Sequence, residues 1–350
     1  MADVEIRDYC GDYEDFSEFW KRIWFSQYAG KMWLTVPDAS FFRWQLGPQS
    51  GALCHVANEG SKLVGGVFSI PYSLRIGSSI HPIGLASGFT VDPDHPRLAL
   101  TLVERLRRRD AERGISFSLS TVFRDTVTPS HRFWVKYAQA FPRNFRFLFP
   151  ISYWAKWLAP HALVQAGIKP WERLTGRALQ PLLPLTPFGC DQHVRPYRPA
   201  DLEQCAQLLD RASARFDWAM LWTRAQLSRQ LEYPAGGTWV YERDGNVQAM
   251  VNYHCAAMHG RERIFGAVIA LWADDGLAGV QRARLLGHVC NHLRQNGVHL
   301  VVAQRSAMMP ASAFVANLFA PIPAPWYLGA VLTPAATPLT LPKTWGLLVM

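Results

Sequence analysis

KLVGGVFSIPYSLRIGSSIHPIGLASGFTVDPDHPRLALTLVERLRRRDAERGISFSLSTV, residues Lys62–Val122, is the stretch that decides the fold. Lys62–Pro71 is a short apolar run after Glu59-Gly60, a dipeptide typical of a hairpin turn. Ile83–Val91 is a second extended run, which Asp92-Pro93-Asp94 ends. The pattern predicts two antiparallel strands followed by a tight loop.

A helix and a further strand follow this loop. Leu98, Leu102 and Leu106 recur at helical spacing, whereas most of the nearby arginines fall on other faces. Gly114 is placed to end the helix in the left-handed conformation, and Ile115–Val122 resumes as a strand. Such a strand–loop–helix unit aims backbone N–H groups at an anion above the loop, commonly a pyrophosphate. The plainer alternative is a βαβ crossover with a basic helix face.

Length and composition indicate a large α/β protein that attracts anions. The chain has 350 residues, 49% of them hydrophobic, which is enough for two domains with a substantial core. Its formal net charge of +9 suits CoA phosphates, an acidic acyl-carrier protein or anionic lipid. The charge is spread along the chain and no nucleic-acid-binding signature occurs, so we expect no nucleic-acid partner.

The cysteines and the N-terminal segment indicate a cytoplasmic protein. The six cysteines are scattered, with no CxxC pair and no histidine cluster, so we expect reduced thiols and no metal site. The N-terminal residues lack the pattern of a signal segment. No apolar run reaches the ~20 residues that a spanning helix needs.

The order of elements returns in the second half of the chain. Gln45-Leu46 and Gln230-Leu231 lie 185 residues apart, as do Gly60 and Gly245. A constant offset with matching element order indicates an internal duplication.

An aromatic and proline-rich stretch, Phe141–Gly189, separates the two halves. Its prolines and charged residues exclude a transmembrane span. A packed linker over the inter-domain groove is favoured, and part of an acyl-chain pocket or a peripheral membrane contact through 141–189 are the alternatives. The sequence thus predicts an N-terminal domain over 1–140, a linker over 141–192 and a C-terminal domain over 193–350.

Several motifs resemble a known family. TVDPDHPRLALTLVERL, residues 90–106, resembles the acyl-CoA-binding strand–loop–helix of the GNAT acyltransferase superfamily. A tandem pair of such domains is the architecture of the N-myristoyltransferases. FFRWQL at 41–46 and SIP at 69–71 are similar to that family's first half, and KTWGLLVM at 343–350 is similar to its C-terminal strand. The resemblance implies two tandem GNAT-like domains of mixed α/β sheets, with acyl-CoA as co-substrate and no metal.

The departures from the family are equally specific. The phosphate loop has no glycine, and Gly88 stands where the family's oxyanion strand carries an asparagine. Phe319–Pro325 replaces an acidic glycine-rich loop that contacts the peptide substrate in that family. Myristate as the acyl group and a glycine-terminal peptide as acceptor therefore do not carry over.

The resemblance also implies roles for individual residues. Backbone amides of Phe89, Thr90 or Val91 would polarise the thioester carbonyl, although a plain core strand is the alternative for this segment. Amides of the loop and first helical turn would hold the pyrophosphate, namely those of His95, Arg97, Leu98, Ala99, Leu100 and Thr101.

In the resembling family the C-terminal carboxylate accepts the proton of the amine, and the matching residue here is Met350. Its apolar surroundings indicate a closing strand, and a buried carboxylate must be paired or used. A carboxylate that reaches solvent is the plainer interpretation, and His95 is a weaker candidate base. Four further residues are candidates for lining the substrate site: Tyr72, Ser120, Thr121 and His254.

The sequence therefore predicts an acyl-CoA-dependent N-acyltransferase that transfers a medium- or long-chain acyl group to an amine by direct attack. A short-chain N-acetyltransferase and a catalytically lapsed acyl-CoA-binding protein are the alternatives. The sequence leaves open the acceptor amine (a small molecule or a peptide), the acyl length, CoA against carrier-protein donor, and the oligomeric state.

Overall fold

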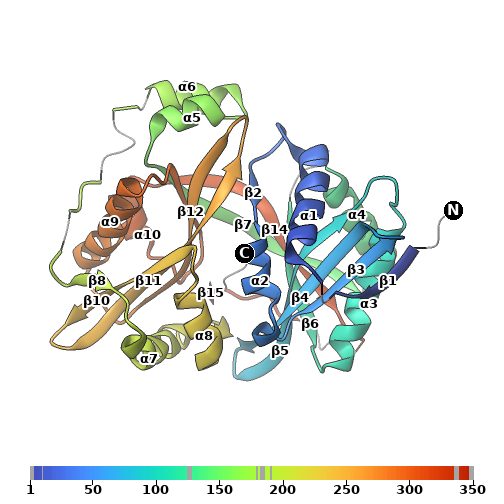
Figure 1. Cartoon of the computed structure of the whole chain (residues 1–350). Helices are drawn as coiled ribbons and strands as arrows, with labels where there is room; N and C mark the ends of the chain where they lie inside the picture. The colour runs from blue at the N-terminus through green and yellow to red at the C-terminus, as the bar shows by residue number, and fades with distance from the viewer. Residues whose placement is uncertain are drawn as a thin grey trace.

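The computed structural model describes residues 4–9, 11–123, 128–178, 180–181, 186–189, 191–334 and 339–346. Within these residues a 15-stranded sheet runs through both halves of the molecule, and helices pack on its faces (Figure 1). The first half contains β1 (Val4–Asp8), α1 (Tyr13–Tyr28), β2 (Leu34–Val36), α2 (Ala39–Leu46), β3 (Leu53–Glu59), β4 (Lys62–Ile76), β5 (Ser79–Val91), α3 (Leu98–Glu112), β6 (Phe117–Phe123), α4 (Pro129–Ala140) and β7 (Phe145–Trp157).

Two helices, α5 (Pro160–Ala166) and α6 (Pro170–Ala178), lead to the second half. That half contains β8 (Val194–Pro196), α7 (Leu202–Ser213), β9 (Trp218–Leu221), α8 (Arg224–Leu231), β10 (Gly236–Arg243), β11 (Asn246–His259), β12 (Arg263–Asp274), α9 (Gly279–Gln295), β13 (Leu300–Gln304), α10 (Ala311–Ala316), β14 (Ala320–Leu332) and β15 (Trp345–Gly346). The order from α1 to β7 recurs from α7 to β14, so the predicted duplication is confirmed.

Local sequence sets the ends of several helices. Asp12 and Asp38 precede α1 and α2, and their carboxylates accept the backbone N–H groups of Glu14 (2.8 Å) and Phe41 (2.9 Å). Gly114 follows α3 with a φ of 74°, the left-handed conformation that the sequence required. The described helices include none long and apolar enough to cross a membrane.

The two halves exchange strands at the centre of the sheet. The strand order is β1-β3-β4-β5-β6-β14-β7-β13-β12-β11-β10-β8. Strand β14 of the second half therefore pairs with β6 of the first half, and β7 of the first half pairs with β13 of the second. Figure 1 shows β7 and β14 side by side between the halves. The expectation of a packed linker is therefore wrong for Phe145–Trp157, where alternating aromatic residues form a central strand despite Pro150.

A second exchange involves two short strands. β2 of the first half pairs with residues 257–259 of β11, and β9 of the second half pairs with residues 73–76 of β4. The partner β9 explains why β4 extends to Ile76 rather than ending near Pro71 as the sequence predicts. The largest apolar cluster accordingly mixes residues of both halves, including Leu74 and Phe117 with Met220 and Met250.

Candidate active site

β5 and β6 separate after a short paired segment. Their parallel pairing runs only from Ile83–Phe117 to Leu85–Leu119. Beyond it, β5 stays paired with β4 as far as Val91, while β6 stays paired with β14. The C-terminal parts of β5 and β6 therefore diverge without ladder hydrogen bonds between their facing edges, and we call the region between these edges the opening.

A β-bulge at Gly88 shapes β5 at this opening. The register passes from Phe68–Ser87 to Gly66–Thr90, so that Gly88 and Phe89 together oppose one residue of β4. Gly88 has a φ of 64°, and a Cβ there would lie 2.3 Å from a ring carbon of Phe68. Only glycine satisfies both conditions, which explains its presence at this position.

The pleat decides which amides face the opening. The N–H of Asp92 donates to the carbonyl of Val64 on β4 (2.8 Å), and alternation along an antiparallel strand turns the N–H of Thr90 the same way. The backbone of Val91 faces away from β4, because its carbonyl accepts a hydrogen bond from the Gln27 side chain (3.2 Å). The geometry therefore favours the amides of Val91 and Phe89 over that of Thr90 as donors into the opening.

Two residues of α1 belong to this site and were missed from the sequence. Trp24 donates its indole N–H to the hydroxyl of Thr90 (2.8 Å), and Gln27 holds Val91 as described. The signal was present, since Gln27 is a polar residue one turn from Trp24 on a helix with an aromatic face. Their contacts fix the backbone of β5 where it borders the opening.

Aromatic and apolar side chains pack beside the C-terminal parts of β5 and β6. Phe123 of β6 and Trp326 of β14 lie with ring centroids 4.9 Å apart and pack against Tyr28 and Met32. On the other face, Phe89 contacts the rings of α4, with 5.2 Å to Phe133 and 5.4 Å to Trp134. Ser120 and Thr121 pair with Gly329 and Leu328 of β14 and lie on the β6 side of the opening.

The loop before α3 differs from an ordinary phosphate-binding loop. Its amides are partly used within the chain: His95 donates to Asp92 (2.9 Å), Leu98 to His95 (3.0 Å) and Ala99 to Pro96 (3.4 Å). Arg97, Leu100 and Thr101 are exposed. His95 Nε2 lies 3.4 Å from a carboxylate oxygen of Glu59, an ordinary loop contact.

Asp92 places a negative charge beside that loop. Burial on its own would raise the pKa of Asp92, but the N–H of Asp94 and the cations of Arg22 (3.2 Å) and Lys62 (3.5 Å) hold it below its usual value. An anion at the start of α3 therefore meets an ionised carboxylate whose nearest cations are already paired.

Trp44 and Arg229 link Tyr72 of the first half to His254 of the second. The Trp44 ring lies 5.0 Å from His254 and 5.7 Å from the Arg229 guanidinium, which in turn lies beside the Tyr72 hydroxyl. Burial lowers the pKa of His254 to about 4, so the imidazole is neutral near pH 7. Burial has the opposite effect on Tyr72 and raises the pKa of its hydroxyl, so that this group is also neutral near pH 7.

A buried polar network supports the histidine. Gln230 Nε2 contacts the Oδ1 of Asn252 (2.8 Å) and Nε2 of His254 (2.9 Å), and Asn252 donates to Thr238 (3.0 Å). The Nδ1 of His254 is buried and has no hydrogen-bond partner in the structure. Gln230 was noticed only as a marker of the repeat, and nothing in the sequence indicated that it would contact His254.

Met350 lies outside the described residues, so the carboxylate predicted as base stays a prediction. The last described strand, β15, pairs Trp345 with Trp218 and Gly346 with Ala219, and Trp345 packs on Phe149. No group of three potential metal ligands occurs among the described residues.

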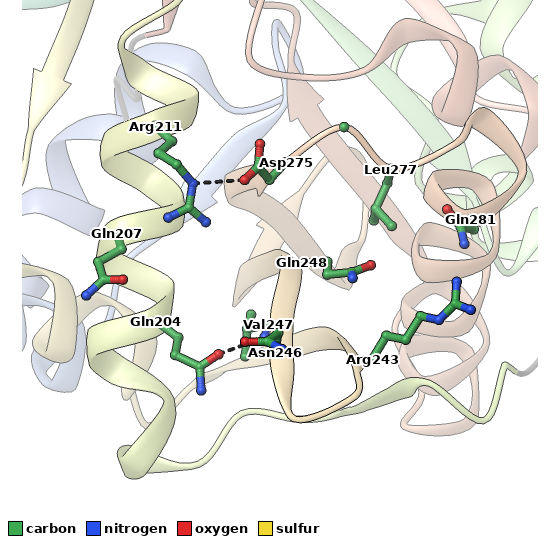
Figure 2. A pocket seen from close by; sticks show the side chains of 11 residues that line it. Gln204, Gln207, Arg211, Arg243, Asn246, Val247, Gln248, Asp275, Leu277 and Gln281 are labelled. Atoms are coloured by element: carbon green, nitrogen blue, oxygen red, sulfur yellow. Dashed lines mark hydrogen bonds and ion pairs between the residues drawn. The ribbon is translucent and has the colours of Figure 1, made fainter.

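A polar pocket lies at the start of α9 in the second half (Figure 2). It is lined by Gln204, Gln207, Arg211, Arg243, Asn246, Val247, Gln248, Asp275, Gly276, Leu277 and Gln281. Figure 2 shows Arg211 pointing at Asp275, to which it donates at 2.8 Å, and Gln204 accepting the N–H of Val247 at 2.8 Å. None of these residues was predicted from the sequence to line a site.

No protein-family model and no curated protein sequence matches the chain. Among solved structures it is similar to Saccharomyces cerevisiae N-myristoyltransferase with bound myristoyl-CoA, with a TM-score of 0.75 and 15% identity over 95% of this chain and 83% of that one. A second structure of that yeast enzyme with bound myristoyl-CoA gives a TM-score of 0.73 at 15% identity, over 95% and 79% of the two chains. A probable N-acyltransferase of unknown function from Enterococcus faecalis V583 gives 0.55 at 11%, over 96% and 74%. The chain therefore has the GNAT-like tandem fold that these proteins share.

Proposed function

We propose that the protein is an N-acyltransferase that uses an acyl thioester, and that the thioester carbonyl binds at the opening between β5 and β6. The observation that carries this proposal is the separation of the two strands beside the Gly88 bulge, with the backbone of Val91 facing away from β4. An N–H at such a strand edge can donate to the carbonyl oxygen, where negative charge develops as the amine attacks. The C–N bond forms, the C–S bond breaks, and the thiolate and the amine proton leave.

A medium- or long-chain acyl group is favoured by the apolar cluster of Tyr28, Met32, Phe123 and Trp326 beside these strands. An acyl chain that packs against this cluster would gain binding free energy with each methylene that it buries. Acyl-CoA is the proposed donor, and the amine acceptor, a small molecule or a peptide, would enter between the halves near Tyr72 and His254. Ser120 and Thr121 would border the acyl group on the β6 side. The carboxylate of Met350 is the proposed proton acceptor.

One observation favours a second candidate, a protein that binds thioesters without turnover or takes them from a carrier protein. Asp92 and the partly used amides of residues 95–99 weaken the site where CoA pyrophosphate would bind. A short-chain acetyltransferase has no such support, because an acetyl group would use little of the apolar cluster of Tyr28, Met32, Phe123 and Trp326.

Thermal denaturation with free CoA and with acetyl-, octanoyl-, myristoyl- and palmitoyl-CoA tests the proposal. A ligand at a hundred times its dissociation constant stabilises the fold by about 2.7 kcal/mol. We expect stabilisation that rises with chain length, and CoA release when primary amines or peptides with a free N-terminus are added. Binding without release would favour the lapsed protein, and a flat response to all thioesters would contradict CoA as the donor.

A further inference from the structure

The α5–α6 hairpin projects at one edge of the molecule (Figure 1). Its second helix, α6, exposes its large apolar side chains to solvent. Trp171 and Leu174 of α6 are 58% and 67% exposed, and at a spacing of three they share one helix face. The buried residue of α6 is instead Gly176, which packs on Leu163 and Val164 of α5. A surface helix normally buries its apolar face, and α6 does the reverse.

Polar side chains hold α6 in this orientation. Glu172 accepts hydrogen bonds from the indole of Trp33 (3.3 Å) and from the N–H of Lys169 (2.9 Å). Arg173 donates to the carbonyls of Gly167 (3.1 Å) and Ile168 (3.3 Å). The residues that a soluble helix would show to water are thus used for anchoring, and the apolar face is left pointing outward.

Cations border this face. Lys169 and Arg177 are exposed on the hairpin, Arg261 is exposed on the turn between β11 and β12, and Arg263 is exposed at the start of β12. That turn lies against α5, because the N–H of Arg261 donates to the carbonyl of Ala166 (2.8 Å). The turn carries one exposed carboxylate, Glu262, so the surface is positively charged.

We propose that α6 and these four cations form a docking surface for an anionic lipid bilayer. Trp and Leu on one face of a short helix are the residues that enter the interfacial layer of a membrane, and flanking Lys and Arg bind anionic headgroups. The net charge of +9 acts in the same direction. Two large apolar side chains are few for a stable protein interface, which buries about 800 Å² per partner. The surface lies apart from the opening between β5 and β6, so this proposal does not require acyl transfer.

Vesicle flotation of the full chain tests the proposal. Wild-type protein should float with vesicles of phosphatidylcholine and phosphatidylglycerol and bind much less to phosphatidylcholine alone. The double change Trp171→Ser and Leu174→Ser should lower the apparent affinity for the mixed vesicles at least about tenfold. Arg261→Gln with Arg263→Gln should lower it roughly fivefold per charge and reduce its salt dependence.

Ile80→Ser is the matched control, because Ile80 is 62% exposed at the start of β5, and Figure 1 shows β5 at the opposite side of the molecule from α6. It should leave flotation unchanged, and all variants should keep the wild-type circular dichroism. Absence of flotation by the wild type, or equal flotation of the Trp171/Leu174 variant, overturns the proposal. So does a concentration-dependent dimer that this variant abolishes while neither protein binds vesicles, since the occupant is then a second copy of the chain.

Discussion

The two halves share one element order but differ in what they bury at matching positions. Under α1 and α2 the first half is apolar, with Phe68 and Ile70 of β4 in its core. At an offset of 184 residues, β11 of the second half carries Asn252 and His254 within a buried hydrogen-bond network.

On the opposite face the contrast is reversed. Asp110 of α3 is buried in the first half, where it accepts a hydrogen bond from Ser118 (2.5 Å) and burial raises its pKa to about 6. At an offset of 183 residues, the second half has Leu293 and Val301, both buried and apolar. The two halves share the register of the sheet but differ in which core positions are polar. The polar core group of the first half, at Asp110, lies on the α3 face, and that of the second half, at Asn252 and His254, lies on the opposite face.

The largest effect is expected at the bulges. Gly88→Ala would place a Cβ against Phe68 at a φ of 64°, and we expect a loss of about 3 kcal/mol in unfolding free energy. Turnover should fall about 10²-fold or more, because the neighbouring amides move. The control is Ala270→Gly at the bulge of β12, which lies near but not at the matching position of the repeat, with a cost of at most about 1 kcal/mol. Equal losses of unfolding free energy in denaturant melts would contradict the special steric requirement for glycine at position 88.

His254 should make the second half sensitive to acid. Its folded pKa of about 4 lies below the ordinary 6.5, so the unfolded chain binds the extra proton and stability falls as pH drops from 6.5 to 4. Up to about 3 kcal/mol is lost in that window and none above it. His254→Ile, which copies Ile70, should flatten this part of the pH profile. A profile that remains as steep in the variant assigns the effect to another group.

Asp110 should make the stability of the protein depend on pH in the opposite direction. Because its folded pKa of about 6 exceeds the unfolded value of 3.8, stability falls as pH rises from 3.8 to 6. Asp110→Asn should therefore stabilise the protein by about 1–3 kcal/mol at pH 8 and by little at pH 4. Chemical denaturation at both pH values measures the difference. A variant that is destabilised at pH 8 would show that the ionised carboxylate is needed.

The smallest change in unfolding free energy is expected for the ion pairs beside the loops that precede α3 and α9. Arg211 and Asp275 are both about half exposed, so Arg211→Gln should change the unfolding free energy by less than about 1 kcal/mol. Arg22→Gln should cost more, because it removes a partner of the buried carboxylate of Asp92. A thermal-melt comparison of the two variants is sufficient. Equal shifts would mean that Asp92 is as well solvated as Asp275.

Much of the fold was accessible from the sequence. Periodicity and turn signals predicted α3, β6 and the end of β5 close to their observed bounds, and the constant 185-residue offset indicated the duplication. The strands β7 and β14 were not predicted, because each is stabilised by partners that lie far away along the chain. No local pattern reports such a pairing.

The candidate site was only partly accessible for the same reason. The segment Phe89–Val91 and the residues Tyr72 and His254 were named from the sequence. Which amides face the opening depends on the register with β4, and the contacts of Trp24 and Gln27 depend on how α1 lies across the sheet. These are tertiary facts that a sequence pattern does not contain.

The strand exchanges make the two halves dependent on one another. A fragment ending at residue 178 would contain β7 without β13, and would lack β14 and β9, leaving exposed edges on β6 and on the end of β4. The complementary fragment would lack β7 and β2. Each fragment expressed alone should aggregate, whereas co-expression should yield one folded complex. The two copies of the duplication therefore fold as one cooperative unit, and truncation of the chain to either copy should not yield a folded domain.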